Sequence, residues 1–284
     1  MILDRFMTPH GLCRTALLAG LVAMAPATHA RAGEVVDMHY DVEIAGTRIL
    51  ELGYRLDLDK AGYQSALSVD SRGILDLFSS IAVDMQVVGR FIGAGIEPVS
   101  FQMGSAKQGK GKQASIVWGP GKVPAARRSY ELPRQREQAI AQALTTGMPD
   151  PLTALLRQGV LAGSSPCTGT ERVFNGAEVY DLAFTVDKND SFSSSDGGVY
   201  RGPAIKCLVT YRPVAGLSHK KTRKNLKDPP RFNIWFAPVA TRSKGIVYVP
   251  VAAAGTFKGK TFVARADRAT LGGAPLNAQS LARQ

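Results

Sequence analysis

Hydrophobic and polar residues alternate with a period of two along the early part of the chain. Between residues 37 and 44 the hydrophobic members of this pattern are Met38, Tyr40, Val42 and Ile44. The same alternation returns in residues 50–59, 63–69 and 83–87. Because successive side chains of a strand point to opposite faces, each segment predicts a strand with one buried and one solvent-facing side. Short turns between these segments predict an antiparallel meander that curves around a core.

The clearest predicted helix lies in the middle of the chain, at residues 150–163. Asp150 can accept hydrogen bonds at the N-cap, Pro151 suits the first turn, and Gly163 can end the helix. The hydrophobic residues that share one helical face, and that we expect to pack on the sheet, are Leu152, Leu155, Leu156 and Val160. Before this helix we expect strands at 99–103 and 115–118, a hairpin tip at 107–111 and an irregular segment at 122–136.

The last third of the chain returns to a strand pattern. The predicted strands cover residues 180–186, 205–211, 232–236, 245–251 and 256–264. We expect a polar loop at 188–198 and a flexible tail at 269–284. No linker divides the chain, so residues 33–268 predict one β-rich domain. The expected fold is mainly β, a curved antiparallel sheet or incomplete β-barrel with one packed α-helix.

The first 32 residues have the pattern of a secretory signal peptide. Arg5 and Arg14 give a positive start, residues 16–25 form a short hydrophobic run, and Ala30-Arg31-Ala32 supplies the small-residue cleavage pattern. The run is shorter than the roughly 20 apolar residues that span a bilayer. A buried helix or a membrane anchor is the alternative. We therefore expect export to the periplasm and a mature chain that starts at Gly33.

Removal of the signal peptide would take Cys13 and leave Cys167 and Cys207. Two cysteines in an oxidising compartment predict a disulfide, and two buried free thiols are the alternative. The cysteines are too far apart in sequence for a C-x-x-C redox motif. The sequence therefore favours a structural disulfide between Cys167 and Cys207.

The formal net charge of +12 is concentrated in two segments. Residues 106–136 contain eight Lys and Arg against one acidic residue, and residues 219–231 contain six against one. Such segments steer anionic partners, although solvated loops that aid solubility have the same composition. The candidate anion-binding residues, in a segment expected to be a loop, are Lys220, Lys221, Arg223 and Lys224. Because an exported protein rarely meets nucleic acid, we expect an envelope partner and no nucleic acid.

Candidate catalytic and metal-binding motifs are weak. The mature chain has two histidines, His39 on the polar side of the first predicted strand and His219 in the basic segment. Metal sites usually need three or four ligands, so no metal or other cofactor is expected. Two Gly-Lys runs, at 104–111 and 255–261, depart from the phosphate-binding loop pattern, and the S-x-x-K at 218–221 lacks its companion motifs.

Several segments, taken in order, resemble one family. They are a strand–Gly46–strand opening, DPLTALLRQ at 150–158, VFNGAEVYDLAF at 173–184, Cys207 in a strand, and IWFAP at 234–238 followed by GIVYVPVAAAGTFKGKTFVA. In this order the chain resembles exported bacterial proteins grouped as domain of unknown function 3108 (DUF3108). The basic insert before Ile234 and the Arg- and Ala-rich end depart from that pattern. The resemblance implies a curved sheet similar to periplasmic lipoprotein carriers, and it brings no established activity.

The sequence favours a non-enzymatic periplasmic protein of the cell envelope. It would bind an anionic or amphipathic component such as a lipid, a lipoprotein or a cell-wall polymer. The hydrophobic side of the curved sheet would hold either an acyl chain or the protein's own helix. A periplasmic scaffold without a small ligand and, third, a cell-wall hydrolase are the alternatives. No residue of the chain can be assigned to catalysis.

Overall fold

The computed structural model describes residues 34–72, 81–107, 110–160, 166–193, 199–257 and 259–276. The predicted signal segment 1–32 lies outside these residues. The strands of the first half are β1 (Glu34–Ile44), β2 (Thr47–Leu58), β3 (Gly62–Ser71), β4 (Ile81–Ile92), β5 (Gly95–Lys107), β6 (Lys110–Val117) and β7 (Ala125–Arg128). Those of the second half are β8 (Thr170–Phe174), β9 (Val179–Ser193), β10 (Arg201–Ala215), β11 (Arg231–Thr241), β12 (Gly245–Phe257), β13 (Lys260–Leu271) and β14 (Ala274–Pro275).

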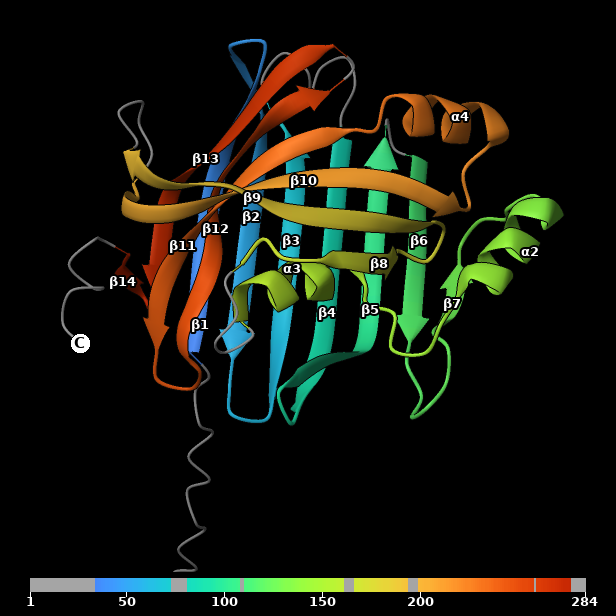
Figure 1. Cartoon of the computed structure of the whole chain (residues 1–284), viewed down its shortest axis with the longest axis horizontal. Coiled ribbons are helices and arrows are strands. Elements are labelled where there is room, and N and C mark those ends of the chain that lie inside the picture. The colour runs from blue at the N-terminus through green and yellow to red at the C-terminus, as the bar shows by residue number, and fades with distance from the viewer. Residues whose placement is uncertain are drawn as a thin grey trace, which may run out of the picture. The chain divides into compact units, whose positions relative to one another are not determined.

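All of these strands belong to one antiparallel sheet. Its order is β7-β6-β5-β4-β3-β2-β1-β13-β12-β11-β10-β9-β8, and β14 pairs with β13. The first and last long strands are neighbours, with Val36 opposite Leu271. The end strands β7 and β8 are not paired with each other, so the sheet stays open. Figure 1 shows strands β8 to β10 passing across the strands of the first half, so the sheet curls back over itself. The predicted curved, mainly β fold is therefore confirmed.

Alternation along the strands builds the core. In β1 the side chains of Met38, Tyr40 and Val42 are buried on the inner face, as predicted. β4 is longer than its predicted pattern: burial keeps alternating as far as Ile92, but Val88 takes an exposed position, so the hydrophobic–polar alternation of the sequence ends at Val87. A side chain at Gly89 would collide with the ring of Tyr63 at 2.2–2.3 Å. Glycine at this position therefore lets β4 lie close to the tyrosine of β3.

Helix α3 (Pro151–Val160) packs on the inner face of the curled sheet. Its N-cap is the predicted one, since Asp150 Oδ1 accepts hydrogen bonds from the backbone N–H groups of Leu152 and Thr153 at 2.9 and 3.0 Å. The helix contacts β3, β4, β5, β8 and β12. At Gly159 an added Cβ would lie 2.2 Å from the carbonyl oxygen of Tyr248, so glycine allows α3 to touch β12. The end of the predicted helix at Gly163 lies outside the described residues.

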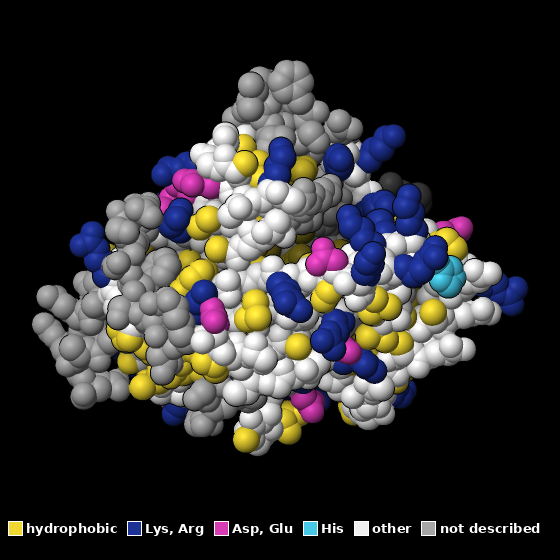
Figure 2. Space-filling view, turned by 45° about the horizontal axis from the view of Figure 1, so that its top comes forward, with side chains coloured by type: hydrophobic (Ala, Val, Ile, Leu, Met, Phe, Trp, Pro, Cys, Tyr) yellow, Lys and Arg dark blue, Asp and Glu magenta, His cyan; other side chains and the backbone are white. Residues whose placement is uncertain are grey.

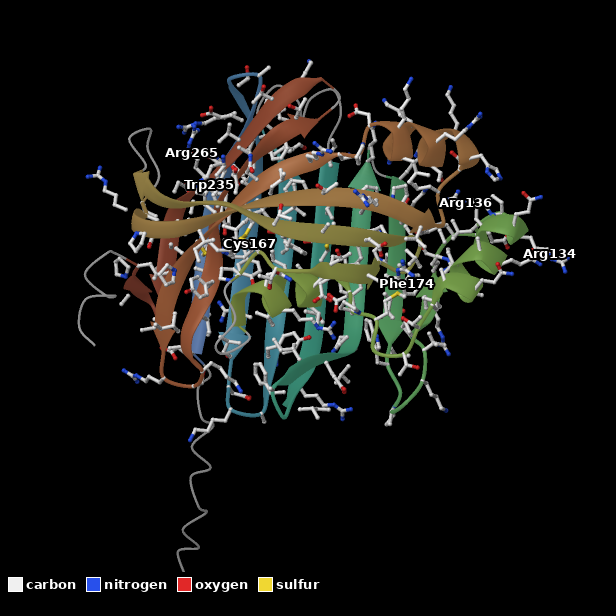
Figure 3. All side chains as sticks on the ribbon, in the orientation of Figure 1. Arg134, Arg136, Cys167, Phe174, Trp235 and Arg265 are labelled. Carbon is white, nitrogen blue, oxygen red and sulfur yellow. A yellow bond between two sulfur atoms is a disulfide. The ribbon has the colours of Figure 1, made fainter. Side chains whose placement is uncertain are left out.

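Cys167 and Cys207 form the predicted disulfide, with their Cα atoms 5.2 Å apart. It joins the loop after α3 to β10 (Figure 3). Both cysteines are buried, and the side chains packed around them include those of Phe184, Val209 and Phe236. The side chain of Gln158 holds the loop, accepting hydrogen bonds from the backbone N–H groups of Cys167 and Thr168. The disulfide thus fixes α3 to the second half of the sheet.

Two helices were not predicted. The segment expected to be a basic loop is helix α4 (His219–Lys227). The expected irregular segment 122–136 contains β7 and the start of helix α2 (Arg134–Ala143). Neither helix has a strong hydrophobic stripe, but Lys, Arg, Gln and Glu favour helices on their own. Hydrophobic periodicity therefore did not detect these two surface helices, because few of their side chains are buried.

Two expected loops also differ from the structure. Strand β9 continues to Ser193 through part of the expected loop 188–198, because it pairs with β10 as far as Arg201. The expected flexible tail from Ala269 begins inside β13, and Leu276 is buried with its backbone N–H bonded to the carbonyl oxygen of Ala269 at 2.9 Å. Residues 269–276 therefore belong to the domain. Residues 277–284 lie outside the described part.

Candidate functional site

Helix α4 brings the predicted anion-binding residues together. Lys220, Lys221, Arg223 and Lys224 all lie on it, and so does Lys227. All five side chains are exposed, and none forms a salt bridge with another described residue. We call these five residues the α4 basic surface. Figure 2 shows Lys and Arg side chains gathering on one side of the molecule.

The positive charges of α4 repel one another. Lys220 and Lys224 are four residues apart, as are Arg223 and Lys227, and such like-charged pairs destabilise a helix by about 0.2–0.5 kcal/mol each. The first turn contains no acidic residue, although the positive end of the helix dipole favours one. Only Lys224 and Lys227, in the last turn, complement the dipole. The helix therefore gains little stability from its charges, and an external anion would relieve their repulsion.

Contacts with β10 hold α4 in place, and α2 holds the turn that precedes it. Arg136 on α2 donates a hydrogen bond to the carbonyl oxygen of Gly216, just before α4. Glu178 lies near both Arg136 and Lys221 and bonds to the hydroxyl of Tyr211. Burial raises the pKa of Glu178, and the two basic residues oppose that rise. Figure 3 shows Arg134 and Arg136 on α2, at the same end of the molecule as α4.

The protein's own helix occupies the inner face. Leu152 and Leu156 are 3% and 2% exposed, and Leu155 packs against the cluster around the disulfide. Thr153 is fully buried and its hydroxyl bonds to that of Tyr63 at 2.7 Å. Of the two expected occupants of the hydrophobic concavity, the structure therefore has α3. The expected place for an acyl chain inside the sheet is filled.

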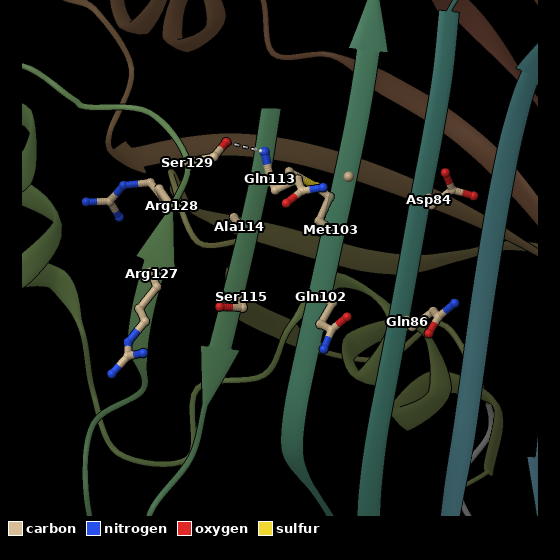
Figure 4. Close-up of a pocket in the computed structure, with 11 residues that line it drawn as sticks. Asp84, Gln86, Gln102, Met103, Gln113, Ala114, Ser115, Arg127, Arg128 and Ser129 are labelled. Carbon is tan, nitrogen blue, oxygen red and sulfur yellow. Dashed lines mark hydrogen bonds between the residues drawn. The ribbon is translucent and has the colours of Figure 1, made fainter. Parts of the chain in front are cut away.

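A polar hollow lies on the opposite, outer face of the first half of the sheet. A cavity of about 430 Å³ there is lined by side chains that include Asp84, Gln86, Gln102 and Arg127 (Figure 4). The sequence did not reveal this hollow. Asp84, Gln86 and Gln102 occupy polar positions of predicted strands, whereas Arg127 lies in the segment 122–136 that was expected to be irregular. The strand register that places them side by side is not visible in the sequence.

His39 lies on the outer face of β1, as predicted. Its Nδ1 is 2.6 Å from Asp267 Oδ1 on β13, and its Nε2 is 3.7 Å from Glu51 Oε2 on β2. No group of three or more His, Cys, Asp or Glu in the described residues is arranged to hold a metal ion. His39 therefore links three neighbouring strands. His219, the other histidine of the mature chain, is exposed at the start of α4.

Comparison with known proteins identifies a shared fold. No family model and no curated protein matches the chain, and the resemblance to DUF3108 stays a prediction. The chain is similar to the solved beta-barrel-like protein of domain of unknown function DUF1849 from Brucella abortus, with a TM-score of 0.52 and 13% identity over 85% of this chain and 98% of that one. A "putative lipoprotein" from Parabacteroides distasonis aligns over 84% of this chain and 95% of its own, with 11% identity and a TM-score of 0.29.

The first of these likenesses shows that the curled, mainly β sheet also occurs in a solved protein from Brucella abortus. The TM-score of the second, 0.29, is too low to show a shared fold. Among the described residues no helix has the length and hydrophobicity needed to cross a membrane. What the chain binds must therefore be argued from its own surface.

Proposed function

We propose that this chain is an exported, non-enzymatic protein of the bacterial cell envelope that docks on phosphate-bearing envelope surfaces through the α4 basic surface. The observation that carries the proposal is five exposed Lys and Arg side chains within one nine-residue helix, none of them in a salt bridge with a described residue. Ammonium and guanidinium groups bind phosphate oxygens through charge-assisted hydrogen bonds. The periplasm, reached through the signal segment 1–32, is the proposed compartment, and membership of DUF3108 is part of the same proposal.

An anionic lipid surface fits better than a ligand held inside the sheet. The inner face is occupied by α3, so the contact has to be made from outside. Leu226 on α4 is 57% exposed and lies among the cations. A helix that combines basic residues with an exposed hydrophobic side chain suits the boundary between lipid headgroups and acyl chains. The surface therefore matches phosphate headgroups with a small hydrophobic anchor.

The test uses the mature chain and vesicles of phosphatidylcholine with or without phosphatidylglycerol. We expect sedimentation with the anionic vesicles only, and weaker binding at higher salt. Reversing Lys220, Lys221, Arg223 and Lys224 to Glu should reduce binding about a hundredfold or more, since each basic residue near such a surface contributes about 1 kcal/mol. The matched control reverses four exposed lysines elsewhere, Lys60, Lys107, Lys110 and Lys112.

Equal losses in the two variants would mean that net charge, and not α4, governs binding. Unchanged binding after reversal of the α4 residues would exclude the proposed role of the helix. A soluble phosphate-bearing cell-wall polymer, added as a competitor, separates the two sources of phosphate. If the polymer displaces the protein while lipid alone does not retain it, the envelope partner is the polymer.

The filled inner face also favours a second candidate, a periplasmic scaffold that binds another protein and no small ligand. Native mass spectrometry of material purified from the periplasm distinguishes the two. A lipid that copurifies with the intact chain, and is lost from the α4 charge-reversal variant, supports the first candidate. A stoichiometric protein partner without lipid supports the scaffold. A cell-wall hydrolase remains the third prediction, and no residue of the site supplies a catalytic step for it.

A further inference from the structure

A second surface, separate from α4, has the construction of a binding groove. The 430 Å³ hollow over β4 to β7 adjoins another of about 240 Å³ over β1 to β4. The two share Asp84 and Gln86, so they form one continuous depression along the outer face of the first half of the sheet. We call this depression the outer groove. The proposed docking of α4 does not use it.

Strand register sets polar side chains in two rows across the groove. In the first row Gln86 lies opposite Gln102, Gln102 opposite Ser115, and Ser115 opposite Arg127. Figure 4 shows these four side chains side by side on successive strands. Because neighbouring strands are about 4.8 Å apart, the row presents a hydrogen-bonding group at each such step. That repeat is close to the advance of an extended sugar chain per ring.

Small residues form the floor between these side chains. In the second row Gly53 lies opposite Ser68, Ser68 opposite Asp84, Asp84 opposite Gly104, and Gly104 opposite Gln113. A Cβ added at Gly104 would meet nothing within 4 Å, so open space lies directly above it. The groove exists because three members of this row, Gly53, Ser68 and Gly104, carry little or no side chain.

The polar groups of the groove are available for a ligand. The side chains of Gln86, Gln102 and Asp84 are exposed, and none of them has a hydrogen-bond partner among the described residues. A glutamine amide donates and accepts at the same time, whereas Asp84 only accepts and Arg127 only donates. Of the other charged residues that line the two hollows, Arg55 pairs with Asp37 at 3.2 Å and Arg128 with Glu137 at 2.7 Å, while Arg268 adds one positive charge. Because three of the four members of the first row are uncharged, the groove suits a ligand rich in hydroxyl and amide groups.

The position of the groove excludes two other ligand classes. An extended peptide binds sheets by pairing with the free backbone of an edge strand, but β2 to β6 are all paired on both sides and the one edge strand at the groove, β7, has only four residues. An acyl chain needs a hydrophobic lining, and the outward side chains of both rows are polar or small. We propose that the outer groove binds an extended glycan that carries acetamido groups, such as a chain of N-acetylated hexoses. Recognition would come from side chains alone, with Gln86 and Gln102 bonding the acetamido groups.

The experiment titrates the mature chain with the β-1,4-linked tetramer of N-acetylglucosamine and follows backbone amide shifts by NMR. We expect saturable shifts confined to the strands under the outer groove, β1 through β7. Gly104→Tyr should fill the groove and lower affinity at least tenfold, as should the double variant Gln86→Ala/Gln102→Ala. The matched control is Gly111→Tyr on β6, where the added Cβ also meets nothing within 4 Å but the residue does not line the groove. The α4 charge-reversal variant should bind the tetramer like the wild type.

Maltotetraose, which has hydroxyl groups but no acetamido groups, tests the ligand class. Tighter binding of the acetylated tetramer supports the proposal, and equal binding of the two sugars contradicts the role given to the glutamines. Absence of saturable shifts with the acetylated tetramer, or full binding by a correctly folded Gly104→Tyr variant, overturns the site. Because vesicle binding by α4 is measured separately, failure here leaves the proposed function standing.

Discussion

Arg128 on β7 donates a hydrogen bond from Nη1 to the carbonyl oxygen of Gly176, which follows β8, over a distance of 2.7 Å. β7 and β8 are the two ends of the open sheet, so this hydrogen bond joins one end to the loop that follows the other. Nη2 of the same side chain donates a hydrogen bond to Glu137 Oε1 on α2 at 2.7 Å. Gly176 also lies against β6, where an added Cβ would be 2.9 Å from the Cβ of Ala114. The sheet is thus closed by side-chain and loop contacts where strand pairing is absent.

Removing the hydrogen bond between Arg128 and Gly176 should destabilise the fold. Arg128→Ala leaves the carbonyl of Gly176 without its partner, and a hydrogen bond to a charged group contributes about 1.5–3 kcal/mol. We expect the free energy of unfolding in urea to fall by that amount. Arg127→Ala, one residue away and exposed, is the control and should change stability by about 0.5 kcal/mol or less. Equal effects of the two substitutions would show that the hydrogen bond from Arg128 to Gly176 adds no stability.

The close approach of α3 to β12 makes Gly159 sensitive to any side chain. Gly159→Ala would place a Cβ 2.2 Å from the carbonyl oxygen of Tyr248, so the helix must shift. Overpacking of this kind costs about 1–3 kcal/mol, although alanine is the better helix former. Thermal and urea unfolding should show the loss. Gly111→Ala, which has open space at its Cβ, should not lower stability; an unchanged Gly159→Ala variant would contradict the tight packing.

The disulfide should stabilise the domain by restricting the conformations of the unfolded chain. Cys167 and Cys207 are 40 residues apart, and the chain-entropy model assigns such a loop roughly 4 kcal/mol. A Cys167→Ser/Cys207→Ser variant should lose stability by an amount of that order. Urea unfolding of the wild type with and without a reducing agent checks this, and the reducing agent should have no effect on the variant. A wild type indifferent to reduction would rule out a stabilising bond.

Asp150 should make stability depend on pH. Burial raises its pKa above the ordinary value, while its hydrogen bonds with Thr153 and Leu152 oppose the rise. A carboxyl with a raised pKa in the folded state stabilises the fold fully below its unfolded pKa, and that stability declines as pH rises through the folded value. Asp150→Asn keeps a cap acceptor without a charge, so its free energy of unfolding should fall less than the wild type's between mildly acidic and neutral pH.

The control for Asp150 is Asp150→Ala, which also removes the cap. We expect it to lose about 0.5–2 kcal/mol at all pH values. Parallel pH profiles of the wild type and Asp150→Asn would show that the charge of Asp150 is not the cause of the pH dependence.

Stability and binding should respond in opposite directions at the start of α4. Lys220→Glu places an acidic residue in a first turn that has none and pairs it with Lys224 four residues later. Each of these changes favours the helix, together by about 0.5–1.5 kcal/mol. The same variant should bind anionic vesicles more weakly than the wild type. A gain in binding would contradict the anion-binding role of Lys220, and a loss of stability would indicate that Lys220 has a structural role.

Much of the fold could be predicted because alternation marks strands wherever one side is buried. Met38, Tyr40 and Val42 follow that rule, and Asp150 marks the helix start by its cap chemistry. Helix α4 could not be predicted in this way, because none of its residues is buried and no hydrophobic stripe results. The groove depends on register: Gln86 and Gln102 face each other only because a bulge at Gly89 sets the pairing of β4 with β5.

The pairing of β1 with β13 places the first and last long strands next to each other, with Val36 opposite Leu271. The start of β1 therefore lies beside the end of β13. Joining those ends with a short linker and opening the chain at the Lys107–Lys110 hairpin would keep every strand beside its present neighbours. The circular permutant should consequently fold to the same sheet, and its folding rate would report how far the β1–β13 contact, now the most distant in sequence, limits the folding of the natural order.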